Sequence, residues 1–317
     1  MTEPSGTGAP RYSVVVPTFN RADTIVPTLA SLAAQTHRDL EVIVADDGST
    51  DDTAERVAAL GMANLVYDRA PNTGPSAARN RGARLARGRY VAFVDTQDTL
   101  APTWLERVDR VLGDALFASW GAVFVVAGRA TGLSRPRRTH AALGGLRAVC
   151  APGQFLVDRR LFFEVGGFDE HLRFSEFTEL WWRLGPALSG SRVVPVDDAL
   201  LVRVLPGAAG HGPASLAYSD ERRLTSALYL LDKHEELLRR RPDLHRSYLR
   251  IAAVAAARGG DGARARALSL SAFRAGPDPR DLLRVAAVSV PPLRRRLWPP
   301  RRPGSPSPPA AVAGRRP

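Results

Sequence analysis

The chain has 317 residues, of which 44% are hydrophobic and 24% charged, and it contains a single cysteine, Cys150. This composition excludes a wholly disordered chain, and one cysteine excludes a disulfide framework or a multi-cysteine zinc site. The net charge of +12 belongs to the end of the chain: residues 221–317 hold 21 basic and 8 acidic groups, which leaves 23 basic and 24 acidic groups for residues 1–220.

The N-terminus carries no membrane signal. Residues 1–10 are polar, lack the apolar core of a signal peptide and are expected to be disordered. The apolar run between Asp114 and Arg129 is too short to cross a bilayer, which takes roughly 18–20 residues. We therefore expect a cytoplasmic protein, at most bound to the inner membrane surface.

Residues 11–218 alternate strand and helix signals. Short apolar strands are expected at 12–17, 41–45, 64–67 and 90–94, with helices between them at 21–35, after 49 or 50, and at 75–86. Such alternation predicts an α/β fold with a mostly parallel sheet and flanking helices. Further on, strands are expected at 119–126 and 155–157 and helices at 159–165 and 176–184, while 192–204 fits two short strands or one bent strand.

The pattern becomes helical from residue 219. Helical periodicity covers 219–241, 244–258, 261–275 and 278–289, so that 219–290 is predicted as a helical region. Its stretch from 252 to 277 resembles one tetratricopeptide-type helix hairpin. In residues 291–317, 9 of 27 residues are proline, punctuated by arginine pairs, which predicts a disordered tail.

Polar residues follow the first two expected strands. They are Pro17, Thr18, Phe19 and Asn20 after the first strand, and Asp46, Asp47 and Ser49 after the second. Ligands of parallel sheets bind at the carboxyl ends of strands, where carboxylates and hydroxyls can hydrogen-bond a nucleoside. The same residues could merely turn the chain into the next helix, and spacing alone does not separate the two interpretations.

A second candidate segment joins a helix start to an acidic loop. Arg79 and Asn80 lie near the start of the helix at 75–86, where a phosphate is favoured. Asp95, Gln97 and Asp98 follow a buried strand, and oxygen ligands there suit a divalent cation that bridges diphosphate oxygens. The structural alternative is a helix cap followed by an ordinary loop.

The third segment spans residues 165–184. Glu176 is a candidate general base, and Gly167 and Trp181 are candidates for the acceptor side, where Trp181 would stack on a sugar. Taken alone, these residues fit an amphipathic helix with aromatic core packing better.

The order and spacing of the segments resemble the family-2 inverting glycosyltransferases of the GT-A fold. The matching pieces, within about residues 12–219, are VVVPTFNRADTI, EVIVADDGSTDDT, GPSAARNRGARLARGRYVAFVDTQDTLAPTWL and RRLFFEVGGFDEHLRFSEFTELWWRL. The resemblance implies a nucleotide-diphospho-sugar donor, here UDP-linked, with Mn²⁺ or Mg²⁺ and inversion by single displacement. It also implies polysaccharide or cell-wall biosynthesis. The donor contacts it implies are Pro17, Thr18, Phe19, Asp47 and Ser49, with Arg79 and Asn80 nearby, and Asp95 as the first metal-motif residue.

The chain departs from the family pattern at three positions. Gln97 stands where the second metal-motif Asp is usual, and Phe177 stands where the catalytic Asp is usual. Arg203-Val204-Leu205 replaces an Arg-x-His motif, with His211 six residues later. One interpretation is an active enzyme in which Asp95 and Asp98 hold the metal, assisted by Gln97, and Glu176 is the base. The other is a catalytically impaired relative that binds nucleotide and serves as a partner or scaffold. A nucleotidyltransferase is disfavoured because the first loop lacks a glycine-rich segment with a phosphate-binding lysine.

The partners are expected to be the donor and an acceptor that the sequence does not specify: a glycan, a lipid-linked sugar or a small molecule. No nucleic-acid partner is expected. Residues 282–297 combine apolar residues with the arginines at 294–296, which fits peripheral contact with an anionic membrane. The alternative is a last helix that packs on its neighbours.

Overall fold

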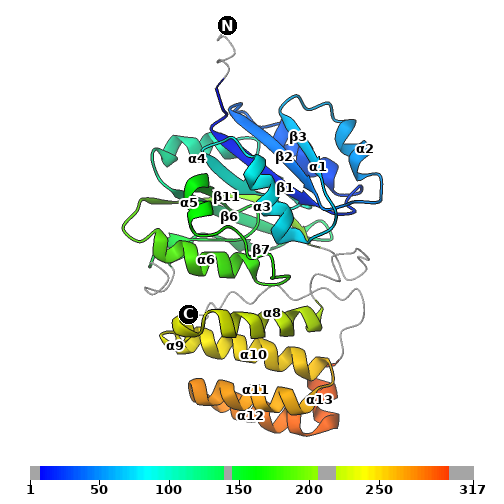
Figure 1. Ribbon diagram of the computed structural model, residues 1–317, viewed down its shortest axis with the longest axis vertical. Helices are drawn as coiled ribbons and strands as arrows, with labels where there is room; N and C mark the ends of the chain where they lie inside the picture. Colours follow the sequence, from blue (N-terminus) through cyan, green and yellow to red (C-terminus); the bar gives the residue numbers. More distant parts are fainter. Residues whose placement is uncertain (1–7, 139–144, 206–218, 300–317) are drawn as a thin grey trace. The chain divides into compact units, whose positions relative to one another are not determined.

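The computed structural model describes residues 8–138, 145–205 and 219–299 (Figure 1). The chain divides into two compact units, each described here by itself. The first comprises residues 1–170 with 176–205, and the second comprises 171–175 with 206–317.

The first unit is built on a mixed sheet with the strand order β3-β2-β1-β4-β10-β6-β11-β5, and β7 pairs with β6 outside this path. Its N-terminal part is parallel, as the alternating sequence predicts, and consists of β1 (Tyr12–Thr18), β2 (Leu40–Asp46), β3 (Leu65–Arg69) and β4 (Tyr90–Phe93). Every residue of β2 and β4 is buried, which explains their continuous apolar sequences.

The rest of the sheet mixes directions. β10 (Phe155–Asp158) runs antiparallel to β4 and to β6 (Phe117–Val126). β11 (Val193–Leu205) is parallel to β6 and antiparallel to β5 (Asp98–Leu100). β11 is one strand whose register shifts after Val196, so the bent-strand alternative for this stretch is the right one.

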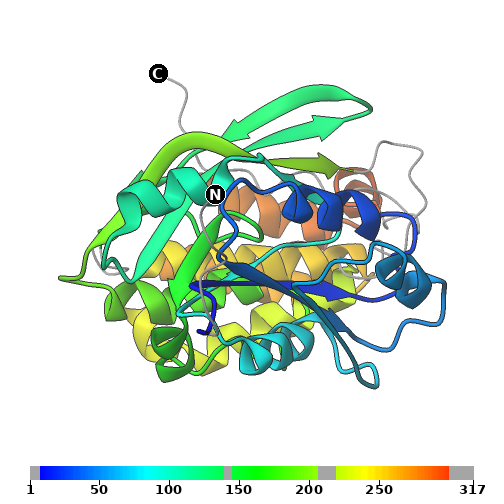
Figure 2. The same ribbon diagram turned by 90° about the horizontal axis from the view of Figure 1, so that it is seen from above.

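β7 (Arg129–Ser134) forms a hairpin with β6 (Figure 2). β8 (Arg137–Arg138) and β9 (Arg147–Ala148) pair in a separate two-stranded sheet.

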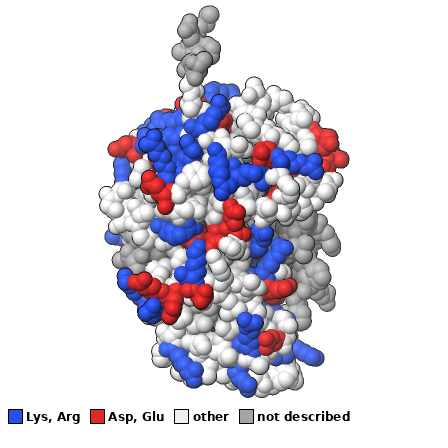
Figure 3. Space-filling model, in the orientation of Figure 1, with Lys and Arg blue, Asp and Glu red and all other residues white. Residues whose placement is uncertain are grey.

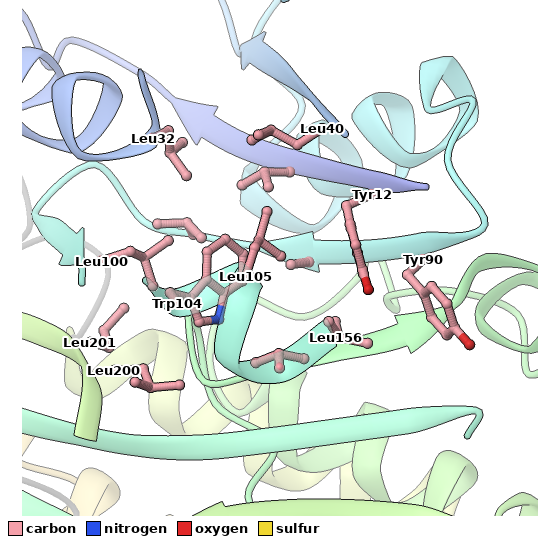
Figure 4. Packing of buried hydrophobic residues seen from close by; sticks show 14 of the residues in the cluster. Tyr12, Leu32, Leu40, Tyr90, Leu100, Trp104, Leu105, Leu156, Leu200 and Leu201 are labelled. Carbon is pink, nitrogen blue, oxygen red and sulfur yellow. The ribbon is translucent and has the colours of Figure 1, made fainter. Parts of the chain in front are cut away.

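Helices flank the sheet of the first unit. They are α1 (Ile25–Ala33), α2 (Thr53–Ala58), α3 (Pro75–Leu85), α4 (Trp104–Leu112), α5 (Arg159–Glu164) and α6 (Glu176–Ala187). α4 buries Trp104, Leu105, Val108 and Leu112, the spacing of one helix face. Figure 4 shows Trp104 and Leu105 in the main core, among leucines from several other elements.

Gly82 brings α3 close to the sheet. A Cβ at this position would lie 2.5 Å from Cγ1 of Val15 in β1 and 3.3 Å from Cβ of Ala45 in β2. Helix α3 begins after Gly74, which has φ +102°, and Pro75 occupies its first turn, where the missing N–H costs no hydrogen bond. Close packing at Gly82 therefore sets the first turns of α3 beside the carboxyl ends of β1 and β2.

The second unit consists of helices in the residues described. They are α8 (Asp220–Lys233), α9 (Glu235–Arg239), α10 (Pro242–Arg258), α11 (Gly262–Ala275), α12 (Pro279–Ser289) and α13 (Pro291–Leu297). Alanines line the contact between α10 and α11, which follow each other through Gly259 and Gly260. Arg250 of α10 donates to the buried carboxylate of Asp281 in α12 at 2.6 Å and to Asp278 at 2.7 Å.

Helix α13 corrects the prediction that the chain is disordered from residue 291. Pro291 and Pro292 occupy the first turn of this helix, where proline is tolerated, and Trp298 packs against a small core cluster. Proline content alone is therefore misleading here. Residues 1–7 and 300–317, also predicted to be disordered, lie outside the described residues. In the described part of the chain, no helix has the length and apolar character needed to cross a membrane.

Candidate active site

The end of β1 presents both a buried hydroxyl and an exposed ring. Pro17 pairs with Ala45 inside the sheet. Thr18 is buried, and its Oγ1 has no hydrogen-bond partner among the described residues. Phe19 is 40% exposed. Because a buried hydroxyl without a hydrogen-bond partner is costly, the Thr18 hydroxyl is able to hydrogen-bond a ligand at this strand end.

The loops after β1 and β2 are tied together. The backbone N–H of Asn20 donates to Ser49 Oγ at 2.9 Å, and Asn20 Oδ1 accepts from the backbone N–H of Thr50 at 2.7 Å. Asn20 has φ +51°, a conformation that asparagine tolerates better than most residues. Contacts of Asn20 and Ser49 with a nucleotide-sugar donor stay predictions.

The two aspartates after β2 have different surroundings. Asp46 is fully buried: its carboxylate accepts from the backbone N–H of Ser49 at 2.8 Å and from the hydroxyl of Tyr67. It therefore holds the turn, and its expected donor contact is wrong. Asp47 accepts from the backbone N–H of Gly74 at 2.7 Å, which fixes the entry to α3. A donor contact by Asp47 stays a prediction.

Arg79 joins two acidic residues that are distant in the sequence. Its guanidinium donates to Asp95 Oδ1 at 2.9 Å and to Glu176 Oε1 at 3.2 Å. The Arg79 side chain is only 5% exposed, against 25% for Asp95 and 17% for Glu176. Arg79, Asp95 and Glu176, all proposed from the sequence, therefore lie together in one place.

The Phe177 ring packs against the Arg79 guanidinium of this ion pair. The Arg79 guanidinium carbon lies 4.7 Å from the centre of the Phe177 ring, within the range of a cation–π contact. The same ring packs edge-on against Phe168, with ring centres 5.0 Å apart. The position where an aspartate is usual in the family thus belongs to the aromatic core.

The backbone before α6 explains why Glu176 still reaches Arg79. Ser175 has φ +67°, in the left-handed region that residues with a Cβ rarely adopt. Glu176 is the first residue of α6 and Phe177 the second. Adjacent helix positions differ by about 100° in direction. Phe177 can therefore point into the core while Glu176 points to Arg79.

Asp95 lies among arginines. Although burial opposes this, the charges of Arg79, Arg203 and Arg21 hold the pKa of Asp95 below its usual value. Burial lowers the pKa of Arg21, while the charges of Asp95 and Asp51 raise it. Sequence reasoning missed Arg21, because one arginine after the first strand carries no pattern that points to an aspartate 74 residues later.

Asp98 is paired too completely to act as a metal ligand. Its side chain is fully buried, and both oxygens accept from Arg203 of β11, with Arg203 Nε to Oδ1 at 2.8 Å. Burial raises the pKa of Asp98 to about 6, although the Arg203 guanidinium favours the charged form. The expected metal role of Asp98 is wrong.

The remaining metal candidates are few. Asp95 and Gln97 are half-buried, and among the described residues no group of three His, Cys, Asp or Glu side chains is placed to hold a metal ion. His211 lies outside the described residues.

Asn80 and Gly167 hold a loop in place. The Asn80 amide donates to the Phe168 carbonyl at 2.8 Å and to Glu170 at 2.9 Å, and its oxygen accepts from the Phe168 N–H at 2.8 Å. Gly167 has φ +66°, and a Cβ there would lie 2.8 Å from Asn80 Oδ1. We therefore correct the donor assignment of Asn80 and the acceptor assignment of Gly167, since both belong to this packed loop.

Trp181 belongs to the core. It is 7% exposed, and its ring centre lies 5.4 Å from that of Phe117. The expected stacking of Trp181 on an acceptor sugar is therefore wrong, and the core-packing alternative holds. On the same helix, Glu179 is buried in a salt bridge with Arg183, which also donates to the Gly167 carbonyl at 2.8 Å.

Comparison with known proteins identifies the class of this fold. The solved structure of TarS from S. aureus with UDP-GlcNAc aligns with a TM-score of 0.59 at 20% identity, covering 91% of this chain and 92% of that one. The mannosyltransferase PcManGT from Pyrobaculum calidifontis, with GDP-Man and Mn²⁺, aligns with a TM-score of 0.52 at 21% identity, covering 92% and 88%. At such identities these likenesses show the fold, and the predicted GT-A architecture is confirmed.

The sequence profile of glycosyl transferase family 2 matches residues 13–174, half of the chain. The chain belongs to glycosyl transferase family 2. Succinoglycan biosynthesis protein ExoO of Rhizobium meliloti is 40% identical over 111 residues, 34% of this chain and 31% of that protein. The matched stretches span about a third or less of the curated relatives at the head of the comparison.

The pair of Asp98 and Arg203 yields a stability test. Arg203→Met leaves a buried carboxylate without its partner and is expected to lower the free energy of unfolding by about 3–5 kcal/mol. Asp98→Asn combined with Arg203→Met removes the charge as well and should restore much of that loss. Urea unfolding followed by tryptophan fluorescence measures both, and a double variant no more stable than Arg203→Met would contradict the pairing.

Proposed function

We propose that this protein transfers a glycosyl group from a UDP-linked sugar to an acceptor hydroxyl, with inversion at the anomeric carbon. The observation that carries the proposal is the meeting of Arg79, Asp95 and Glu176 beside the strand ends. Family membership supports this assignment, because the match to glycosyl transferase family 2 covers residues 13–174, which include Arg79 and Asp95 and end just before Glu176.

The donor would lie across the carboxyl ends of β1 and β2. The nucleoside would contact Thr18, Phe19 and Asp47, where Thr18 Oγ1 has no partner among the described residues. The diphosphate would be held by Arg79 and Arg21, since guanidinium groups bind phosphate oxygens in bidentate fashion. The similar structures include one with UDP-GlcNAc and one with GDP-Man. These structures do not decide between the two nucleotides, and UDP is part of the proposal.

A divalent cation fits this site only together with the donor. Asp95 and Gln97 offer one charged and one neutral oxygen ligand, while Asp98 is held by Arg203. Mg²⁺ is commonly bound by one or two carboxylates plus substrate phosphates. Here the phosphates of the donor would complete the set of ligands that Asp95 and Gln97 begin. When bound, the cation would neutralise charge on the diphosphate.

Glu176 would serve as the general base. The acceptor oxygen attacks the anomeric carbon on the face opposite the nucleotide, and its proton passes to the Glu176 carboxylate. The new carbon–oxygen bond forms as the bond to the diphosphate breaks, and the electron pair leaves with UDP. Arg79, which already contacts Glu176 and Asp95, would stabilise the charge that develops on the leaving group.

A second proposal has a specific observation in its favour. Phe177 fills the usual base position and Gln97 the usual metal position, so the chain could bind nucleotide without turnover and act as a partner protein. The ion pair between Arg79 and Glu176 favours the enzyme, because it keeps a half-buried carboxylate beside Asp95.

The acceptor is a glycan, a lipid-linked sugar or a small molecule. The name of ExoO, a succinoglycan biosynthesis protein, supports polysaccharide synthesis as the setting. A cytoplasmic location stays a prediction.

Glu176→Gln tests the base. The substitution keeps the shape of the side chain but removes the proton acceptor, so kcat should fall roughly 10²–10⁴-fold while UDP affinity is retained. Turnover is measured as UDP release from UDP-sugars and UDP binding by calorimetry. Glu164→Gln, at an exposed position of α5, is the matched control and should leave both unchanged.

Two outcomes would contradict the proposal. Full turnover in Glu176→Gln would place the base elsewhere. Tight UDP binding by the unaltered chain, without turnover of any donor, would favour the partner-protein proposal.

The metal proposal predicts linked binding. Without nucleotide, Mn²⁺ should give no measurable heat, whereas Mn²⁺ should tighten UDP binding. In the Gln97→Asp variant, the factor by which Mn²⁺ tightens UDP binding should rise about tenfold, because a carboxylate replaces a neutral ligand. In EDTA, where no metal ion is available, the variant should bind UDP no more tightly than the unaltered chain. Micromolar Mn²⁺ binding by the nucleotide-free protein would contradict the proposal.

A further inference from the structure

The last two described helices expose a set of large apolar side chains. In α12 and the residue that follows it, Leu282 is 49% exposed, Leu283 70% and Val290 48%. In α13, Leu293 is 40% exposed and Leu297 50%. These five residues are called the terminal apolar face below.

The opposite side of α12 is firmly attached to the helices before it. Ala287 and Val288 are buried, and Asp281 is fully buried in ion pairs with Arg250 and Arg284. The orientation of α12 is therefore set by its inner side, and the leucines of its outer side face away from the unit. The end of a helical array normally needs a polar outer face for solubility, and this one lacks it.

The charge within residues 279–317, the segment that carries the terminal apolar face, is almost entirely of one sign. Residues 279–317 contain nine arginines and a single acidic residue, Asp281, whose charge is neutralised inside the unit. Arg280, Arg295 and Arg296 are exposed. In Figure 3, basic side chains, with some acidic atoms beside them, lie among mainly uncharged surface at the end formed by α11, α12 and α13.

We propose that the terminal apolar face docks on an anionic lipid bilayer. Its leucines would enter the boundary between headgroups and acyl chains, and the exposed arginines of α13 would contact lipid phosphates. A short amphipathic segment with apolar residues on one side and arginines beside them has the chemistry of a surface-bound membrane anchor.

The charge distribution decides between a bilayer and a second copy of the chain. A symmetric dimer through this face would bring Arg295 and Arg296 of the two copies toward each other, with no exposed acidic residue in the segment to balance them. Like charges placed face to face oppose association. An anionic bilayer instead supplies both an apolar layer and negative charge.

Vesicle co-sedimentation of the full chain tests this proposal, which does not rest on the proposed catalytic function. Binding is expected to vesicles of phosphatidylcholine with phosphatidylglycerol, and to be weak with phosphatidylcholine alone. Replacing Arg294, Arg295 and Arg296 with Gln should weaken binding on the order of a hundredfold, since each arginine near an anionic surface contributes about one factor of five. Leu282→Ser with Leu283→Ser should weaken it about tenfold or more.

The matched controls lie in the first unit. Arg135, Arg137 and Arg138 are exposed, and replacing all three with Gln removes the same charge elsewhere. Leu133, 47% exposed, is the control for the leucines as Leu133→Ser. Neither control should alter binding to the anionic vesicles.

Three outcomes would overturn the proposal. They are no binding to anionic vesicles, unchanged binding in the leucine variant, or equal weakening by the control arginines. Analytical ultracentrifugation adds a fourth: a dimer that the leucine variant converts to monomer would assign the face to a second copy of this chain.

Discussion

The site depends on one buried arginine shared by two carboxylates. Arg79 contacts Asp95 and Glu176 at once and lies over the Phe177 ring, so it joins α3, the loop after β4 and the start of α6. A buried guanidinium needs compensating charge, and here two acids and an aromatic face supply it. Removing Arg79 would leave two partly buried carboxylates without the partner they share, so this residue holds these elements together.

The surrounding structure keeps Arg79 where it is. Gly82 lets α3 lie against β1, and the Asn80 amide fixes the loop that carries Phe168, the ring that packs on Phe177. Asp47 fixes the entry to the same helix through Gly74. Two residues that we first assigned to ligand contacts, Asn80 and Asp46, thus hold the frame around the site.

What the sequence predicted well is what depends on neighbouring residues. Alternating apolar runs located the parallel strands, and motif spacing singled out Arg79, Asp95 and Glu176. The errors concern contacts between distant segments: Arg203 lies 105 residues from Asp98 and takes up both of its oxygens. For Trp181 the local helix pattern favoured core packing, and the assignment to the acceptor side, which followed the family resemblance, was the error. Proline counting also failed at α13, because two prolines fit a first helical turn.

The departures at Gln97 and Phe177 each replace a carboxylate with an uncharged side chain. At Gln97 this leaves less negative charge beside the place where a diphosphate would lie, whereas Phe177 belongs to the aromatic core. Arg79 and Arg21 are near Asp95, and a site with this balance would hold an anionic donor while making weaker demands on a metal ion. Glu176, directed to Arg79 by the turn at Ser175, would supply the proton acceptor.

A double-mutant cycle between Arg79 and Glu176 tests the central claim most directly. UDP release from UDP-sugar would be measured for the unaltered chain, Arg79→Lys, Glu176→Gln and the double variant, with Arg84→Lys, an exposed position of α3, as the control. If the two residues act as one unit, the double variant should be no slower than the slower single variant. Losses that add fully in free energy would show that Arg79 and Glu176 act independently, and would contradict the account.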